Sequence, residues 1–152
     1  MNEAKTVDAA LTLLQGVWFP THISEDGQLV ATYEPTFPAG ANPWLMTIVG
    51  NSWHVTSNAD YYATGGWLRL MPEEGRLTFV HPLLQREFDS QSAYRLHENE
   101  LLLQSGGFAW SGKYDCISTT RYVKVAMSPT PEMTALIERD ACHWERLSGR
   151  PA

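Results

Sequence analysis

The sequence predicts an all-β protein: an antiparallel up-and-down barrel of about eight strands, with a short N-terminal helix and an amphipathic C-terminal helix. Strand-like runs separated by turn signals fill residues 14–125, and short hairpin-type connections join them in sequence order. A clear helical pattern follows at residues 130–148. The pattern alone also permits a sandwich, but the hairpin order favours the barrel. We expect one domain over residues 1–152, a length that is sufficient for one core.

The first element is a short helix at residues 6–14, in which apolar residues recur at helical spacing and Thr6 is available as the N-cap. The periodicity then changes, and residues 14–19 form the first strand. We expect this strand to end at Pro20, which lacks the N–H group that a sheet ladder needs.

The remaining strands are separated by residues that favour turns. Asp26 and Gly27 form a turn of hairpin type, and residues 35–43 contain three prolines without periodicity, which predicts a loop. The expected strands are residues 28–34, 44–49, 53–57, 61–71, 76–81, 90–96, 100–105 and 117–125.

The C-terminal helix has the most complete set of signals. Thr130 is a good N-cap, Pro131 suits the first helical position and Gly149 suits the C-cap. An apolar stripe runs along one face and predicts that the helix packs on the barrel. The stripe consists of Met133, Leu136, Ile137, Trp144 and Leu147.

Composition and charge exclude several partner classes. The net charge is −6 and the chain has no basic run, which argues against nucleic acid as a partner. The apolar runs are too short for a membrane span, and we find no signal peptide. Cys116 and Cys142 permit one disulfide at most, and the sequence leaves open whether they pair. Two reduced thiols in a cytoplasmic protein is the preferred interpretation.

Four segments occur in the order found in small bacterial lipocalin-like domains of the calycin superfamily, which the chain resembles. They are LQGVW at 14–18, LMTIVGNSWHV at 45–55, AYRLHENELLL at 93–103 and TTRY at 119–122. The chain departs from the secreted lipocalins at their Thr-Asp-Tyr motif, because Ala59, Asp60 and Tyr61 come too early. This departure argues against the carrier roles of that group.

The resemblance implies a structural signature made of Gly16, Trp18 and Arg121. In this arrangement the Trp18 indole closes one end of the barrel and the Arg121 guanidinium, from the last strand, stacks on it. Any function then lies at the opposite mouth, near the loops at 35–43 and 106–112.

The sequence offers little evidence for catalysis or for a metal. The five histidines are scattered and predict no metal site, and no cofactor motif is present. No Gly-X-Ser-X-Gly motif is present either. Glu87 and Asp89 could share a strand face and do acid–base work, although such a pair is more often a solvated loop. The sequence therefore leaves an enzyme open and favours a non-catalytic role.

Aromatic residues distributed over the strands and over one loop are the better functional lead. They can line an apolar cup, with His81 as a polar group near its mouth, or they can simply fill the barrel. The candidate ligand-binding residues are Trp44, Trp53, Tyr62, Trp67, Phe79, His81, Phe108 and Trp110.

The preferred hypothesis is non-catalytic binding of a small hydrophobic or aromatic ligand in the barrel. The alternative is a protein–protein interaction module of inhibitor or immunity type, with a filled barrel and exposed loop aromatics Phe37, Phe108 and Trp110. A second alternative is an isomerase, lyase or hydrolase that acts in the cavity through His81, Tyr62 or Glu87.

Overall fold

A computed structural model describes residues 4–36, 44–57, 62–81, 86–107 and 116–148 of the chain. Its elements are α1 (Val7–Leu14), β1 (Gly16–Glu25), β2 (Gln28–Thr32), β3 (Leu45–Val49), β4 (Ser52–Ser57), β5 (Tyr62–Met71), the 3-10 turn η1 (Pro72–Glu74), β6 (Arg76–His81), β7 (Arg86–His97), β8 (Glu100–Gly107), β9 (Cys116–Ala126) and α2 (Pro131–Ser148).

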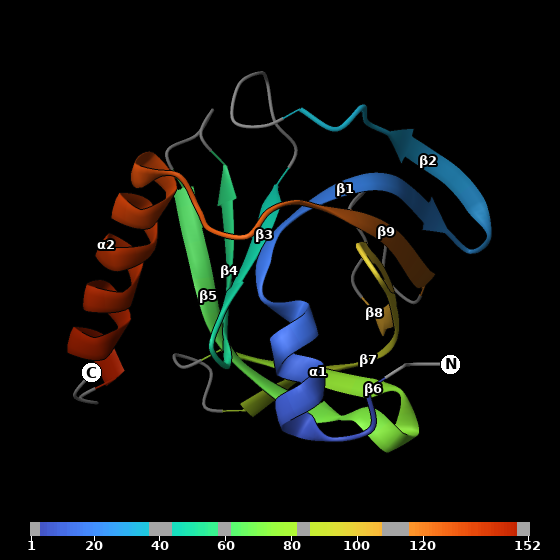
Figure 1. Cartoon of the computed structure of the whole chain (residues 1–152), viewed down its shortest axis with the longest axis horizontal. Helices are drawn as coiled ribbons and strands as arrows, with labels where there is room; N and C mark the ends of the chain where they lie inside the picture. Colours follow the sequence, from blue (N-terminus) through green and yellow to red (C-terminus); the bar gives the residue numbers. More distant parts are fainter. Residues whose placement is uncertain (1–3, 37–43, 58–61, 82–85, 108–115, 149–152) are drawn as a thin grey trace.

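The strands form the expected antiparallel barrel (Figure 1). Strands β3 to β9 pair in sequence order, and β1 pairs with both β3 and β9, so eight strands close on themselves. Strand β2 lies outside this ring and pairs with β1. The predicted fold class is therefore confirmed, including one helix before the strands and one after them in the chain.

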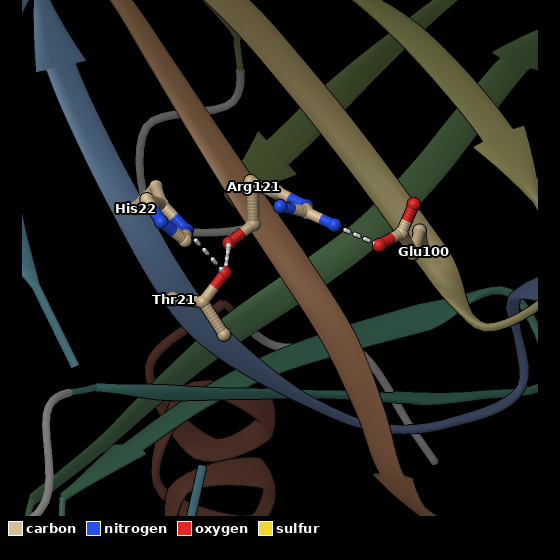
Figure 2. A network of polar contacts seen from close by, with 4 residues as sticks. All are labelled: Thr21, His22, Glu100 and Arg121. Carbon is tan, nitrogen blue, oxygen red and sulfur yellow. Dashed lines mark hydrogen bonds and ion pairs between the residues drawn. The ribbon is translucent and has the colours of Figure 1, made fainter. Parts of the chain in front are cut away.

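Strand β1 is longer than the sequence predicts, because it continues through Pro20 to Glu25. The missing N–H of Pro20 does not end the strand, but the register with β9 shifts directly after it, between Pro20 and His22. Thr21 is the extra residue of this β-bulge. The Thr21 hydroxyl donates to the Arg121 carbonyl oxygen at 3.2 Å and lies 3.0 Å from Nδ1 of His22 (Figure 2).

The end of the barrel where β1 begins is closed by Trp18 and α1. Trp18 is fully buried, and its indole N–H donates to the carbonyl oxygen of Leu14 at 2.8 Å. Leu14 is the last residue of α1, where carbonyl groups have no partner within the helix. Thr6 caps the other end of α1, as predicted, by accepting a hydrogen bond from the Ala9 amide. This end of the barrel is called the floor below.

The prediction that Arg121 stacks on Trp18 is wrong. Trp18 pairs with Lys124 on β9, and the Lys124 ammonium lies 5.1 Å from the centroid of the indole ring and donates to the Leu13 carbonyl oxygen. Arg121 pairs with His22 beyond the bulge, on the outer face of the barrel. Its guanidinium forms an ion pair with Glu100 there (Figure 2).

Helix α2 packs on the outside of the barrel against β4 and β5 (Figure 1). Met133 is fully buried in an outer cluster with Val17, Phe19 and Leu45. The Thr130 hydroxyl accepts a hydrogen bond from the Met133 amide, which confirms the predicted N-cap. The apolar stripe therefore holds the helix on the sheet at its first turns.

Gly16, the first residue of β1, has no room for a side chain. Its φ is +130°, and a Cβ there would lie 2.7 Å from the Ala126 carbonyl oxygen. We expect Gly16→Ala to lower the free energy of unfolding by about 3 kcal/mol, through strain and steric overlap together. Gly27→Ala is the control, because Gly27 also has a positive φ but has nothing within 4 Å of a Cβ. Urea unfolding should show a loss of about 1 kcal/mol for the control; equal losses would contradict the overlap with Ala126.

The contacts of Lys124 give a second stability prediction. Lys124→Met keeps the aliphatic stem but removes the cation over Trp18 and the hydrogen bond to Leu13, so it should cost about 1–2 kcal/mol. Arg121→Met removes a surface ion pair and should cost less than about 1 kcal/mol. Urea unfolding of both variants checks this order. A larger loss of unfolding free energy for Arg121→Met would contradict it and would indicate that Arg121, not Lys124, stabilises the floor.

Candidate functional site in the barrel interior

The lower half of the interior, next to the floor, is packed with apolar side chains. Its buried cluster includes residues from α1 and from all eight barrel strands: Leu14, Trp18, Met46, Ile48, Trp53, Leu68, Leu70, Leu77, Tyr94, Leu96, Leu101, Leu103 and Tyr122. All of these side chains are less than a tenth exposed. These side chains therefore form the apolar lining of the floor half.

Two predicted ligand-binding residues meet inside the barrel. The Trp53 and Phe79 rings lie edge to face, with centroids 5.0 Å apart and an interplanar angle of 72°. Trp53 belongs to the interior cluster, and Phe79 is partly buried and packs against it. The indole N–H of Trp53 is buried and has no hydrogen-bond partner. A buried donor of this kind calls for a water molecule or a ligand acceptor, because leaving it unpaired costs about 1–3 kcal/mol.

A polar strip runs along the opposite end of β1 and its neighbour β9. Glu25 pairs with Ser118, and Ile23 pairs with Thr120, so these four side chains share one face. Thr120 and Ser118 lie two and four residues before the core residue Tyr122 on β9. Because side chains in a strand alternate between its two faces, both point into the interior with Tyr122. Glu25, Ser118 and Thr120 are all less than a tenth exposed.

The strip continues onto β8 and β7 and includes a thiol. Ser105 of β8 pairs with Ser118, and Ser92 of β7 pairs with the core residue Leu77. Cys116, at the start of β9, contributes a buried thiol to the same face. Burial raises the pKa of the nearby Tyr122 phenol, so this group stays neutral. The strip is thus a wall of neutral hydroxyl groups with one carboxyl group, Glu25.

Glu25 was not among the predicted site residues, although the sequence contains one signal for it. Glu25 stands two residues after Ile23, so the two share a strand face, and an inward Ile23 implies an inward Glu25. Because the strand was expected to end at Pro20, the orientation of Glu25 was not considered. The bulge at Thr21 also changes the alternation: without it, alternation from Trp18 would point His22 inward instead of Ile23.

The other predicted site residues do not gather at one place. Trp67 is half-buried and alternates with the core residue Leu68, which puts it on the outer face of β5. Trp44 is half-buried just before β3. Tyr62 and His81 lie on β5 and β6, but their side chains are outside the described set, as is that of Glu87. Phe37, Phe108 and Trp110 also lie outside the described residues.

A groove of about 540 Å³ lies on the outer surface beside β7 and β8. Its lining combines charged, polar and apolar side chains, namely Lys5, Pro72, Glu73, Glu74, Gly75, Ala93, Tyr94, Arg95, Leu102, Gln104 and Thr119. Ala93 pairs with Gln104, and Gln104 with Thr119, in one row across three strands. The groove is separate from the polar strip, because Thr119 points outward where Ser118 and Thr120 point inward.

His54 is a buried polar residue on the outer face of β4. Burial lowers its pKa to about 4, so the imidazole is neutral near pH 7. A Cβ at residue 65 would lie 2.7 Å from its Nδ1, so Gly65 provides the room for this ring. Nδ1 of His54 and the hydroxyl of Thr47, which pairs with it across the strands, both lack a hydrogen-bond partner.

His54 and Ser52 resemble a nucleophile and base in spacing only. Nε2 of His54 lies 3.2 Å from the Ser52 hydroxyl oxygen, and that hydroxyl donates to the Val49 carbonyl oxygen at 2.7 Å. Because the serine proton is committed to a carbonyl group, Nε2 acts as a donor and not as a base. A pKa of about 4 also makes the imidazole a weak base at neutral pH. The contact stabilises the β3–β4 turn.

Within the described residues, no group of three or more His, Cys, Asp or Glu side chains is arranged to hold a metal ion. None of the described helices combines the length and the apolarity needed to cross a membrane. Comparisons with protein-family models, with curated proteins and with solved structures gave no match.

The lowered pKa of His54 predicts how stability depends on pH. The unfolded chain binds this proton below about pH 6.5 and the folded chain only below about pH 4, so stability is full above pH 6.5 and is lost as pH falls toward 4. The loss assigned to His54 is about 3 kcal/mol. Urea unfolding at a series of pH values should show a shallower slope in His54→Gln. His97→Gln, at an exposed histidine, is the control and should keep the original slope; a slope unchanged in both would contradict the assignment.

Proposed function

We propose that the protein binds a small, largely apolar or aromatic molecule inside the barrel, without catalysis, as a lipocalin-like binding protein of the cytoplasm. The observation that carries the proposal is the buried indole N–H of Trp53, which has no hydrogen-bond partner inside a largely apolar cluster. A ligand with a hydrogen-bond acceptor would satisfy this donor while its rings or alkyl groups contact Trp53 and Phe79.

The polar strip supports the same proposal from the other side. Polar side chains at one end of a mostly apolar interior offer hydrogen-bonding groups to a bound molecule. Here Glu25, Ser118 and Thr120 line the interior at the end away from the floor. A barrel of eight strands has room for one small ligand. Apolar contacts and a few polar groups at one end are the usual composition of such a site.

The titratable groups that the structure describes support a non-catalytic role. Ser52 and His54 are arranged as a structural contact, and the pKa of Tyr122 is raised away from neutrality. Among the described residues, Glu25 is the one carboxylate on the interior strip. The described part of the site therefore offers binding groups in place of an acid–base pair.

A conservative tryptophan pair tests the proposal. Trp53→Phe keeps an aromatic ring in the interior and removes the N–H donor, so it should weaken ligand binding about tenfold, the value of one neutral hydrogen bond. Trp67→Phe makes the same change on the outer face and should leave binding unaltered. Native mass spectrometry of freshly purified protein beside a denatured control detects the bound compound, and titration with the extracted compound gives the affinity.

Two results would contradict the proposal. One is an absence of excess mass in the native protein together with an indole emission that apolar compounds do not change. The other is a bound compound whose affinity falls in Trp67→Phe and not in Trp53→Phe, which would place it on the outer face of β5.

A further inference from the structure

The outer groove of about 540 Å³ beside β7 and β8 has the volume of a small-ligand site, which usually lies between about 300 and 1,000 Å³. Outward side chains of the sheet form its base, among them Ala93 and Leu102. Leu102 is 38% exposed, so the base offers an accessible apolar surface. Gln104 and Thr119 border this surface, and Nε2 of Gln104 donates to the Thr119 hydroxyl oxygen at 3.3 Å. The base thus combines an apolar centre with a neutral polar border.

Two acidic residues stand on a fixed turn at the groove. Glu73 and Glu74 belong to η1, which connects β5 and β6. The Gly75 amide donates to the Pro72 carbonyl oxygen at 3.1 Å, and the Gly75 carbonyl oxygen accepts from the Tyr94 amide of β7 at 2.8 Å. Because these two hydrogen bonds attach the turn to β7, the backbone holds both acidic residues at the groove.

Two basic residues, Lys5 and Arg95, line the same groove. Arg95 and Arg121 both pair with Leu102, from the strands on its two sides. Glu100 neutralises Arg121 through an ion pair. Lys5 and Arg95, by contrast, form no ion pair with any residue that the structure describes. The groove therefore presents positive charge that the described residues leave unneutralised.

Charges of both signs thus line one groove without neutralising each other. Glu73 and Glu74 form no ion pair with Lys5 or Arg95, although η1 is hydrogen-bonded to the residue next to Arg95. A purely anionic ligand would meet two carboxylates and a purely cationic ligand two cations, and both contacts are unfavourable. A ligand that carries one charge of each sign has the complementary pattern. A guanidinium group suits the carboxylate of such a ligand, because it can donate two parallel hydrogen bonds.

We propose that this groove binds a small zwitterion with an aliphatic body, of the class of apolar amino acids and dipeptides. The ligand carboxylate accepts hydrogen bonds from the Arg95 guanidinium, and the ligand ammonium group donates to the carboxylates of Glu73 and Glu74. The aliphatic body lies on Leu102, and Lys5 adds positive charge. This site is separate from the ligand proposed inside the barrel and does not depend on it.

Isothermal titration calorimetry of the full-length protein with the dipeptide alanyl-leucine tests the proposal. The free dipeptide should show saturable binding. N-acetyl-alanyl-leucine lacks the ammonium group and alanyl-leucine amide lacks the carboxylate, so each should bind about fivefold more weakly, the value of one exposed ion pair. Binding of the free dipeptide should also weaken as the salt concentration rises from about 0.01 M to about 1 M, because the ions screen both contacts.

Variants of the groove separate the two charge contacts. Arg95→Gln should weaken binding of the free dipeptide about fivefold and abolish its advantage over the amide form. The double change Glu73→Gln and Glu74→Gln should abolish the advantage of the free dipeptide over the acetylated form. Arg76→Gln and Glu132→Gln make the same chemical changes at exposed residues outside the groove lining and should keep both advantages. Urea unfolding of each variant establishes that it remains folded.

Three outcomes would overturn the proposal. One is the lack of saturable binding up to about 10 mM dipeptide. Another is equal affinity for the free dipeptide and its two capped forms, which would show that neither charge is recognised. The third is a loss of dipeptide binding in Trp53→Phe with none in Arg95→Gln, which would place the dipeptide inside the barrel.

Discussion

The whole structure depends on the pairing of one strand, β1, with three others. Over its ten residues, β1 pairs with β3 at its beginning, with β9 along most of its length and with β2 at its end. The pairing with β9 joins residues about a hundred positions apart and closes the barrel. The close approach of Gly16 to Ala126 and the burial of Trp18 both belong to this strand. Closure and the sealed floor therefore have a common origin.

The bulge at Thr21 divides β1 into two parts with opposite consequences. Before it, Trp18 and Pro20 face the interior together with Lys124 and Tyr122 of β9. After it, Ile23 and Glu25 face the interior, while His22 and Arg121 face outward (Figure 2). One extra residue reverses which side chains line the barrel, because side chains in a strand alternate with a period of two. The bulge thus places Ile23 and Glu25, in place of His22 and Ser24, in the interior beside Ser118 and Thr120.

The sequence predicted the features that depend on neighbouring residues, such as helix caps and turns. Thr6 and Thr130 cap their helices, Asp26 and Gly27 form the expected hairpin turn with positive φ, and the glycine and tryptophan of β1 mark the floor. The partner of Trp18 was beyond prediction, because it depends on register shifts between β1 and β9 that leave no local trace. A resemblance supplied Arg121 as that partner, and the register supplies Lys124. Both are cations on the same strand, three residues apart, and only the pairing distinguishes them.

Strand register and strand length also decide which predicted residues lie in the interior site. Trp53, Phe79 and Trp67 were all predicted as aromatic residues on separate strands. Trp53 and Phe79 do meet, since β4, β5 and β6 pair without a register shift between the residues concerned. Trp67 lies on the other face of its strand. Glu25 was missed because the strand was expected to end too early.

Apolar and polar groups lie at opposite ends of β1. At the floor, Trp18 contacts the Leu14 carbonyl oxygen, the Lys124 ammonium and the packed core. At the other end, β1 finishes in the buried carboxyl group of Glu25. The pairing of β1 with β9 runs through both regions, from Val17 at the floor to Glu25 at the far end. Apolar closure and polar lining are therefore two parts of the same strand pair, separated by the bulge at Thr21.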